Sequence, residues 1–175
     1  ARPAVARAAA EALVAEGCRA LISFGLAGGL AADLAPGSIV LADAVVTADG
    51  RHFTVDAGWQ HRLHAALGAD FPVATGTIVG GDAPVTTPAA KHALGQATGA
   101  LACDMESHRL AAVALTAGLP FLVVRAIGDA ATRALPAWLG TTIEADGRPR
   151  LGAVLAGLAR RPGDLPALIK IAFET

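Results

Sequence analysis

The sequence predicts an α/β layered fold, in which helices pack against a central sheet. Short apolar runs rich in β-branched residues alternate with longer segments of helical periodicity, and glycine or proline bounds each strand-like run. The chain has 175 residues and no internal repeat. A single domain over residues 1–175, with a substantial core, is therefore expected.

The first half of the chain is expected to begin with a helix and then alternate. Gly17 ends the first helix, and Pro36-Gly37 precedes the second strand. In order, the expected elements are a helix at 2–16, a buried strand at 20–24, a glycine-rich turn at 25–29, a strand at 38–46, a helix at 59–68 and a strand at 73–79.

The second half is expected to continue the alternation. Thr87 is the predicted N-cap of a helix that has Pro88 in its first turn and ends near 95–99. The remaining expected elements are a helix at 105–117 stopped by Gly118, a buried strand at 120–127, and two short closing helices at 150–160 and 164–172.

The composition narrows the class of protein. Hydrophobic residues make up 54% of the chain but aromatic residues only 4%, so the core is built from Ala, Val, Leu and Ile. The formal net charge of -1 gives no electrostatic reason to expect nucleic acid as a partner. Cys18 and Cys103 lack metal-ligand spacing and are interpreted as free thiols of a cytoplasmic protein. No apolar run approaches the roughly 20 residues of a membrane span.

Two carboxylate-bearing segments contain the candidate catalytic residues. The run Asp104-Met105-Glu106-Ser107 lies at the start of a predicted helix, and Asp129 follows a predicted buried strand. Such ends are where α/β folds present groups to ligands. Helix capping is the alternative for Asp104 and for Asp129, and it accounts less well for Glu106. Arg125 lies within the apolar strand, so it is expected to pair with a carboxylate.

Two other patterns carry weaker signals. The run Gly25–Gly29 is either a backbone cradle for a phosphate or ribose-like group or simply a tight turn, and its spacing is not that of a P-loop or dinucleotide fingerprint. His61 and His64 are three residues apart without a third ligand nearby, so no metal site is expected.

These segments together resemble the purine nucleoside phosphorylase and uridine phosphorylase superfamily. The resemblance runs in order through Phe24–Leu30, Pro36–Val40, Gly81-Asp82, Asp104–Glu106 and Arg125–Asp129. Within it, the chain is most similar to hopanoid biosynthesis-associated phosphorylases, through Ser23–Leu30, Asp104–His108 and the tail Leu158–Ile169. The implied fold is a three-layer α/β/α sandwich with a central, mostly parallel twisted sheet.

The resemblance implies an enzyme that cleaves the N-glycosidic bond of a purine nucleoside by phosphorolysis or hydrolysis. For the hopanoid branch the implied substrate is adenosylhopane, from which adenine is released. A methylthioadenosine/S-adenosylhomocysteine nucleosidase and a non-catalytic nucleoside-binding protein are the alternatives. No metal or organic cofactor is implied, and phosphate is a candidate co-substrate.

The resemblance also implies roles for individual residues. Asp129 would hydrogen-bond to or protonate N7 of the base, and Glu106 would accept hydrogen bonds from the sugar hydroxyls. Met105 would pack against the ribose. The remaining implied substrate-binding residues are Ala27 and Gly28 near the anomeric carbon, Pro84 and Val85 around the base, and Ser23.

Departures from the family pattern bear on whether phosphate or water accepts the sugar. Ser23 and Leu26 stand where phosphorylases of this superfamily commonly have Arg and a hydroxyl residue, which favours hydrolysis over phosphorolysis. Gly128 replaces a serine that would orient Asp129. The family's first strand is not found before Ala1 and is expected to be lacking here.

The expected partners are a small-molecule nucleoside, with or without a lipid group, and further copies of the chain in a homo-oligomer of two or more subunits. The residues Arg160, Arg161 and Lys170 beside Leu and Ile are compatible with peripheral contact with a membrane. Ordinary amphipathic packing is the favoured interpretation of the same pattern.

Overall fold

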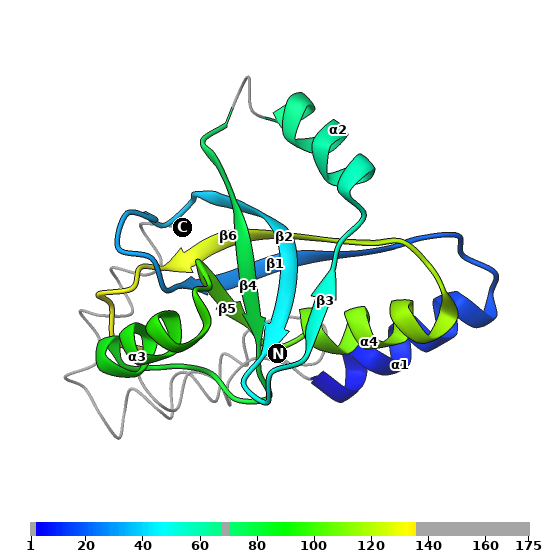
Figure 1. Cartoon of the computed structure of the whole chain (residues 1–175). Helices are drawn as coiled ribbons and strands as arrows, with labels where there is room; N and C mark the ends of the chain where they lie inside the picture. The colour runs from blue at the N-terminus through cyan, green and yellow to red at the C-terminus, as the bar shows by residue number, and fades with distance from the viewer. Residues whose placement is uncertain (1–2, 68–70, 136–175) are drawn as a thin grey trace, which may run out of the picture.

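The computed structural model describes residues 3–67 and 71–135, and Figure 1 labels its elements. The helices are α1 (Pro3–Ala15), α2 (Ala57–Leu67), α3 (Pro88–Thr98) and α4 (Ser107–Ala117). The strands are β1 (Leu21–Gly29), β2 (Ile39–Thr47), β3 (His52–Thr54), β4 (Val73–Gly80), β5 (Ala102–Asp104) and β6 (Phe121–Asp129). The two closing helices predicted from the sequence, and the basic residues assigned to a membrane surface, lie outside the described residues.

Local signals account for the helix ends. Thr87 caps α3, and its hydroxyl accepts a hydrogen bond of 3.2 Å from the backbone N–H of Ala90. Gly99 and Gly118 end α3 and α4 in the left-handed conformation, with φ of 66° and 64°. These predicted boundaries are confirmed to within a few residues.

The predicted glycine-rich turn at 25–29 is wrong, because β1 continues through it to Gly29. The backbone there is paired on both sides. Residues 25–28 pair with β6, and Gly28 and Gly29 pair with β5. The strands β3 and β5 were not predicted. Asp104 closes β5, and α4 begins three residues later, at Ser107.

The sheet is mostly parallel, as predicted, and it closes on itself. Its order is β3-β2-β4-β5-β1-β6, with a further pairing between β2 and β6. The long β1–β6 and β2–β4 ladders are parallel, as is β4–β5. The antiparallel contacts β1–β5, β2–β3 and β2–β6 are short. The N-terminal part of β2 pairs with β6, whereas its C-terminal part pairs with β3 along the same edge.

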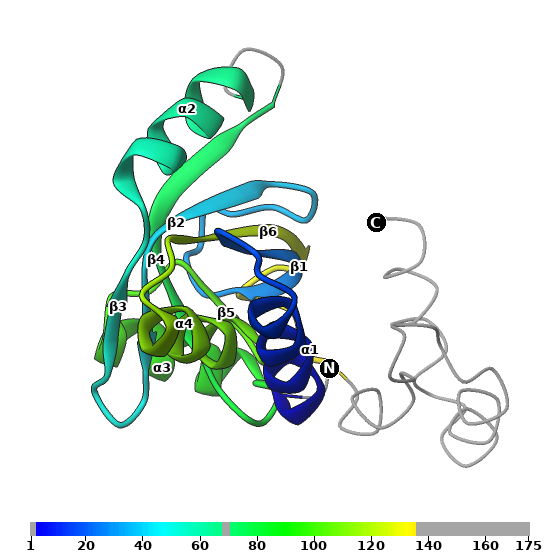
Figure 2. The ribbon, with the colours of Figure 1, turned by 90° about the vertical axis from the view of Figure 1, so that its right-hand side faces the viewer.

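Helices flank this sheet, which confirms the predicted layering. In Figure 1, α3 lies to the left of the sheet, and α1 and α4 lie to the right. Helices α1 and α4 lie side by side in both views, and α4 contacts several strands (Figure 2). The main core is aliphatic, as the composition predicts. Its fully buried members include Val40, Leu41, Val45, Ile78, Leu122 and Val123.

Candidate functional site

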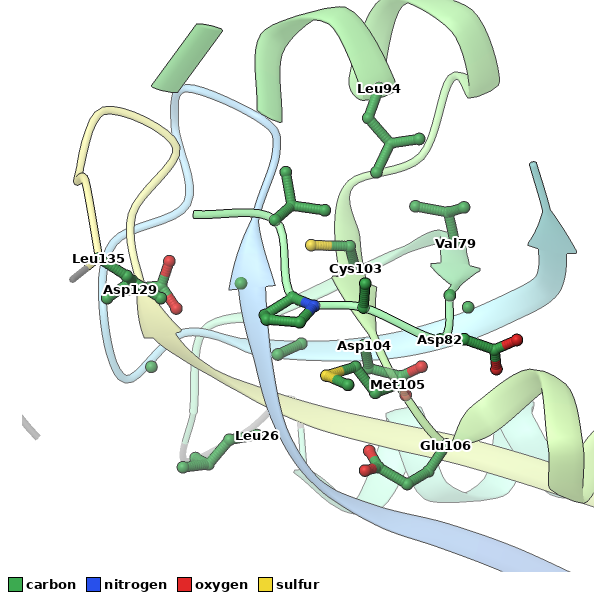
Figure 3. Close-up of a pocket in the computed structure, with 18 of the residues that line it drawn as sticks. Leu26, Val79, Asp82, Leu94, Cys103, Asp104, Met105, Glu106, Asp129 and Leu135 are labelled. Atoms are coloured by element: carbon green, nitrogen blue, oxygen red, sulfur yellow. The ribbon is translucent and has the colours of Figure 1, made fainter. Parts of the chain in front are cut away.

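The carboxyl ends of β1, β4, β5 and β6 meet at one end of the sheet. Gly28 pairs with both Cys103 and Asp129, and Gly80 pairs with Asp104. A pocket of about 550 Å³ opens there (Figure 3). Ligands of parallel α/β folds, with open or closed sheets, bind at the carboxyl ends of the strands, so the topology alone makes this pocket the candidate site.

A bulge brings Asp129 opposite Gly28. The parallel register runs Ala27 to Ile127 and then Gly28 to Asp129, so Gly128 is an extra residue in β6. A Cβ atom at Gly28 would lie 3.4 Å from Asp129 Oδ2 and 3.3 Å from Cys103 Sγ. A side chain at Gly28 would therefore crowd the Cys103 thiol and contact the Asp129 carboxylate.

Asp129 is held by a lysine that sequence reasoning missed. Lys91 lies on α3, and its side chain is 0% exposed. Its ammonium group forms an ion pair with Asp129 Oδ2 and donates to the carbonyl oxygens of Ala130 and Arg133, at 2.8 and 3.0 Å. Capping of a following helix, the alternative for Asp129, finds no support among the described residues, because no helix follows β6 up to residue 135.

Glu106 and Met105 approach the pocket from another element. They connect β5 to α4, and both are half-buried lining residues. Glu106 occupies the N-cap position of α4, but its side chain makes no capping hydrogen bond. Burial, and next the charge of Asp104, raise the pKa of the Glu106 carboxyl group. In the view of Figure 3, Met105 lies between Glu106 and Asp129.

A buried ion pair lies beneath the pocket and holds the segment that carries Met105 and Glu106. Asp104 and Arg125 are almost wholly buried, and Arg125 Nε donates to Asp104 Oδ2 at 2.6 Å. Asp104 Oδ1 accepts hydrogen bonds from the backbone N–H and the hydroxyl of Ser107, at 3.2 and 2.7 Å. The prediction that Arg125 pairs with a carboxylate is confirmed, and Asp104 satisfies the first backbone N–H of α4 although it lies in β5.

Ser23 belongs to this buried network and is not among the residues that line the pocket. Its hydroxyl accepts a hydrogen bond of 2.6 Å from Arg125 Nη2, and its carbonyl oxygen accepts one of 2.8 Å from Nη1. The other predicted site residues line the pocket: Ala27, Gly28, Pro84, Val85, Met105, Glu106 and Asp129.

Apolar side chains make up much of the remaining lining. Leu26, on β1, lines the pocket and is 63% exposed. The other apolar lining residues with large side chains include Val79, Val85, Leu94 and Leu135. A pocket with an apolar lining and a few carboxylates suits a ligand that is largely apolar and carries a few hydrogen-bonding groups.

Asp82 contributes a further carboxylate to the lining. It accepts hydrogen bonds from Arg109 Nη2 at 2.7 Å to Oδ2 and 2.8 Å to Oδ1. His108 Nε2 lies 3.1 Å from the same carboxylate. The Arg109 hydrogen bonds, with a smaller contribution from His108, hold the pKa of Asp82 below its ordinary value. Asp82 is therefore a neutralised charge beside the pocket.

Cys103 is a buried thiol of the lining that sequence reasoning did not assign. Burial, and next the charge of Asp129, raise the pKa of the Cys103 thiol to about 11. A thiol in this environment is protonated at neutral pH, so it packs rather than acting as a nucleophile.

The residues 3–67 and 71–135 contain no group of three or more His, Cys, Asp or Glu side chains that could hold a metal ion. Within the same ranges, none of the helices has the length and apolar character that crossing a bilayer requires.

Fold and site together define an α/β protein with a carboxylate-bearing ligand pocket at the ends of its strands. The chain belongs to the phosphorylase superfamily, whose family model matches residues 2–158.

Solved structures share the fold. The S-adenosylhomocysteine nucleosidase of Streptococcus pyogenes, in complex with 5-methylthiotubericidin, is 28% identical, with a TM-score of 0.71 over 75% of this chain and 64% of that one. The 5′-methylthioadenosine/S-adenosylhomocysteine nucleosidase of S. pneumoniae is 27% identical, with a TM-score of 0.67 over 73% of this chain and 64% of that one.

The futalosine hydrolase of Helicobacter pylori shares the fold at 21% identity, with a TM-score of 0.68 over 73% of this chain and 62% of that one. This chain therefore spans less than two-thirds of the length of these solved structures.

Proposed function

We propose that the protein binds a purine nucleoside in this pocket and cleaves its N-glycosidic bond. The observation that carries the proposal is the pair of carboxylates Glu106 and Asp129, which line one pocket from different elements of a phosphorylase-superfamily fold. Solved nucleosidases at 27–28% identity support the same reaction class.

The two carboxylates suit the two charges that the reaction develops. Breaking the bond between C1′ and N9 leaves an oxocarbenium-like sugar and a base that carries the electron pair. Glu106 accepts hydrogen bonds from the sugar hydroxyls, and its negative charge favours the cationic sugar. Asp129 donates a proton or a hydrogen bond to N7 and so stabilises the departing base. Met105 packs against the ribose between them.

Water is the proposed acceptor. The described lining contains the carboxylates of Asp82, Asp104, Glu106 and Asp129, and no arginine or lysine is among these lining residues. The basic side chains Lys91, Arg109 and Arg125 already pair with Asp129, Asp82 and Asp104. A phosphate dianion would therefore meet the Glu106 carboxylate without a bidentate cation in this lining to bind it. The guanidinium of Arg125 is engaged with Asp104 and Ser23 beneath the pocket.

The proposed substrate releases adenine and carries an apolar group on the ribose, as adenosylhopane does. The exposed Leu26 and the apolar lining support an apolar substituent. Methylthioadenosine and S-adenosylhomocysteine are the second candidates, because the S. pneumoniae structure is a nucleosidase of both compounds and the S. pyogenes structure is an S-adenosylhomocysteine nucleosidase.

Adenine release by the full natural protein tests the proposal. Release is measured from adenosylhopane and from methylthioadenosine, each with and without phosphate. Release without phosphate from adenosylhopane is the expected result, and preferential use of methylthioadenosine would select the second candidate. A requirement for phosphate would overturn the proposal that water is the acceptor of the sugar. Tight adenine binding without release from any substrate would overturn catalysis altogether.

The Asp129→Asn variant tests the assigned acid. We expect turnover to fall by roughly 10²–10⁴-fold, the range for loss of general acid catalysis. Asp33→Asn is the matched control, because Asp33 is exposed and is not among the residues lining the pocket. Near-normal turnover by a folded Asp129→Asn protein would remove Asp129 from the mechanism.

A further inference from the structure

The buried Lys91 is the feature of this molecule that the reaction as described above does not use. It lies on α3, on the same helix face as the half-buried Leu94, Gly95 and Thr98. Its side chain is fully buried. A buried ammonium group costs several kcal/mol of desolvation unless it is paired and hydrogen-bonded, so its placement requires compensating partners.

The partners of Lys91 all lie in one short stretch of chain. The ammonium group meets Asp129 Oδ2 and the carbonyl oxygens of Ala130 and Arg133, which matches its three donors to three acceptors. Lys91 therefore fixes the end of β6 and the residues after it against α3. Asp129 remains 14% exposed and lines the pocket while this contact is made.

The position of Asp129 is constrained from the other side as well. Gly28 leaves room for the carboxylate across the β1–β6 ladder, and Cys103 closes the space beside it. Gly128 carries no side chain that could orient Asp129, whereas the Lys91 ammonium group contacts this carboxylate directly.

We propose that Lys91 is the positioning residue of the Asp129 acid, holding its carboxyl group toward the base and stabilising the carboxylate that remains after proton transfer. This inference rests on the proposed nucleoside cleavage. Asp129 enters the step protonated on Oδ1, the oxygen that is not paired with Lys91. In the step, this O–H bond breaks and an N7–H bond forms. The C1′–N9 bond breaks with its electron pair going to the base. Lys91 keeps its three protons, and its charge lowers the energy of the new carboxylate.

The test compares two substrates that differ in their need for an acid. A purine nucleoside that the wild type cleaves needs its base protonated or hydrogen-bonded as it leaves. The N7-methylated form of the same nucleoside carries the positive charge already, so its base departs neutral without an acid. A defect that acts through Asp129 must therefore be large on the first substrate and small on the second.

Two variants separate the effect of the Lys91 charge on Asp129 from its hydrogen bonds to the carbonyl oxygens of Ala130 and Arg133. Lys91→Gln removes the charge but retains a donor for the carbonyl oxygens, whereas Lys91→Met removes both. We expect both variants to lose roughly 10²-fold or more in kcat on the ordinary nucleoside and less than about threefold on the N7-methylated one. His92→Gln is the control, because His92 is the exposed neighbour on α3.

Equal losses on the two substrates, or full activity of Lys91→Gln on the ordinary nucleoside, would overturn the inference. If Lys91→Met does not fold, the Lys91→Gln comparison decides alone. In the double variant with Asp129→Asn, losing Lys91 must add little, because the residue acts through a group already removed. A wild type that cleaves neither nucleoside would instead overturn the proposed function, and this inference with it.

Discussion

Arg125 and Asp104 form an ion pair almost wholly removed from water, with side chains that are 2% and 1% exposed. Arg125 Nε and Nη2 lie 2.6 and 2.5 Å from the same oxygen, Asp104 Oδ2. The pair joins β6 to β5, and its hydrogen bonds to Ser23 and Ser107 extend it to β1 and α4. Because Met105 and Glu106 directly follow Asp104, this network sets where both reach the pocket.

Removing Arg125 should strongly destabilise the fold. Arg125→Met leaves the Asp104 carboxylate buried without its partner, a change that typically costs about 3–5 kcal/mol. Urea unfolding of both proteins measures the difference in the free energy of unfolding. Arg51→Met is the control, because Arg51 pairs with Asp49 at 50% and 65% side-chain exposure, where solvent screens the pair and a much smaller cost is expected. Equal costs for the two variants would contradict the structural role of the buried pair.

A methyl group at Gly28 should impair the site more than the fold. In Gly28→Ala the new Cβ would lie 3.3 Å from Cys103 Sγ and 3.4 Å from Asp129 Oδ2, so the thiol beside the carboxylate must move by a few tenths of an ångström and the carboxylate is newly contacted. We expect roughly a 10²-fold loss of kcat/KM, since small displacements of catalytic groups have effects of this size. Gly58→Ala is the matched control, because its Cβ would lie at similar distances, 3.4 Å from Arg62 Nη1 and 3.5 Å from Asp56 Oδ1, and Gly58 is not among the residues lining the pocket. Similar kinetics for both variants would show that the Asp129 carboxylate tolerates displacement.

The sequence predicts the long elements of this fold because their signals are local. Thr87, Gly99 and Gly118 mark helix ends through caps and left-handed turns. Strand β6 coincides with the apolar run that predicts it. The three-residue strands β3 and β5 carry no such pattern. Strand β3 is the second arm of a short hairpin with β2. Strand β5 exists because β4 and β1 offer it edges, and that pairing depends on residues far away in the sequence.

The site is predictable in part for the same reason. Arg125 predicts a carboxylate partner, because a buried guanidinium must be paired, but nothing nearby in the sequence identifies Asp104 as that partner. Lys91 carries a weaker signal, because it lies on the same helix face as Leu94, and helical spacing alone does not distinguish a buried lysine from one that extends into solvent. The run Gly25–Gly29 was wrongly predicted to be a turn. Glycines within a strand that allow close approach of other groups have the same sequence pattern as a turn.

Cys103 should resist alkylation in the folded protein. With a thiol pKa of about 11, roughly one molecule in a thousand carries the reactive thiolate at pH 8. Labelling at Cys103 should therefore be slow at pH 8 and accelerate about tenfold per pH unit up to pH 10, as followed by mass spectrometry of peptides. Cys18, which is partly exposed, is the internal comparison. Equal labelling of both thiols at pH 8 would contradict the burial of Cys103.

Glu106→Gln should separate function from stability. The folded-state pKa of this carboxyl group is raised above the ordinary 4.5, chiefly by burial, so the native state holds the proton more tightly than the unfolded chain does. The ionised side chain therefore costs stability once the pH rises through the folded-state pKa, and below 4.5 that cost is absent. A neutral glutamine should raise Tm at pH 7, and the gain should vanish below pH 4.5.

The same variant should lose most of its nucleoside-cleaving activity, because it no longer offers a negative charge to the cationic sugar. Glu11→Gln is the matched control, since Glu11 is exposed and pairs with Arg7 at 2.8 Å, and its substitution should neither raise Tm at pH 7 nor lower activity. A Glu106→Gln protein with lower Tm at pH 7 than the wild type would show that its buried carboxylate is stabilised by contacts that outweigh its desolvation. Unchanged activity would remove Glu106 from the sugar subsite.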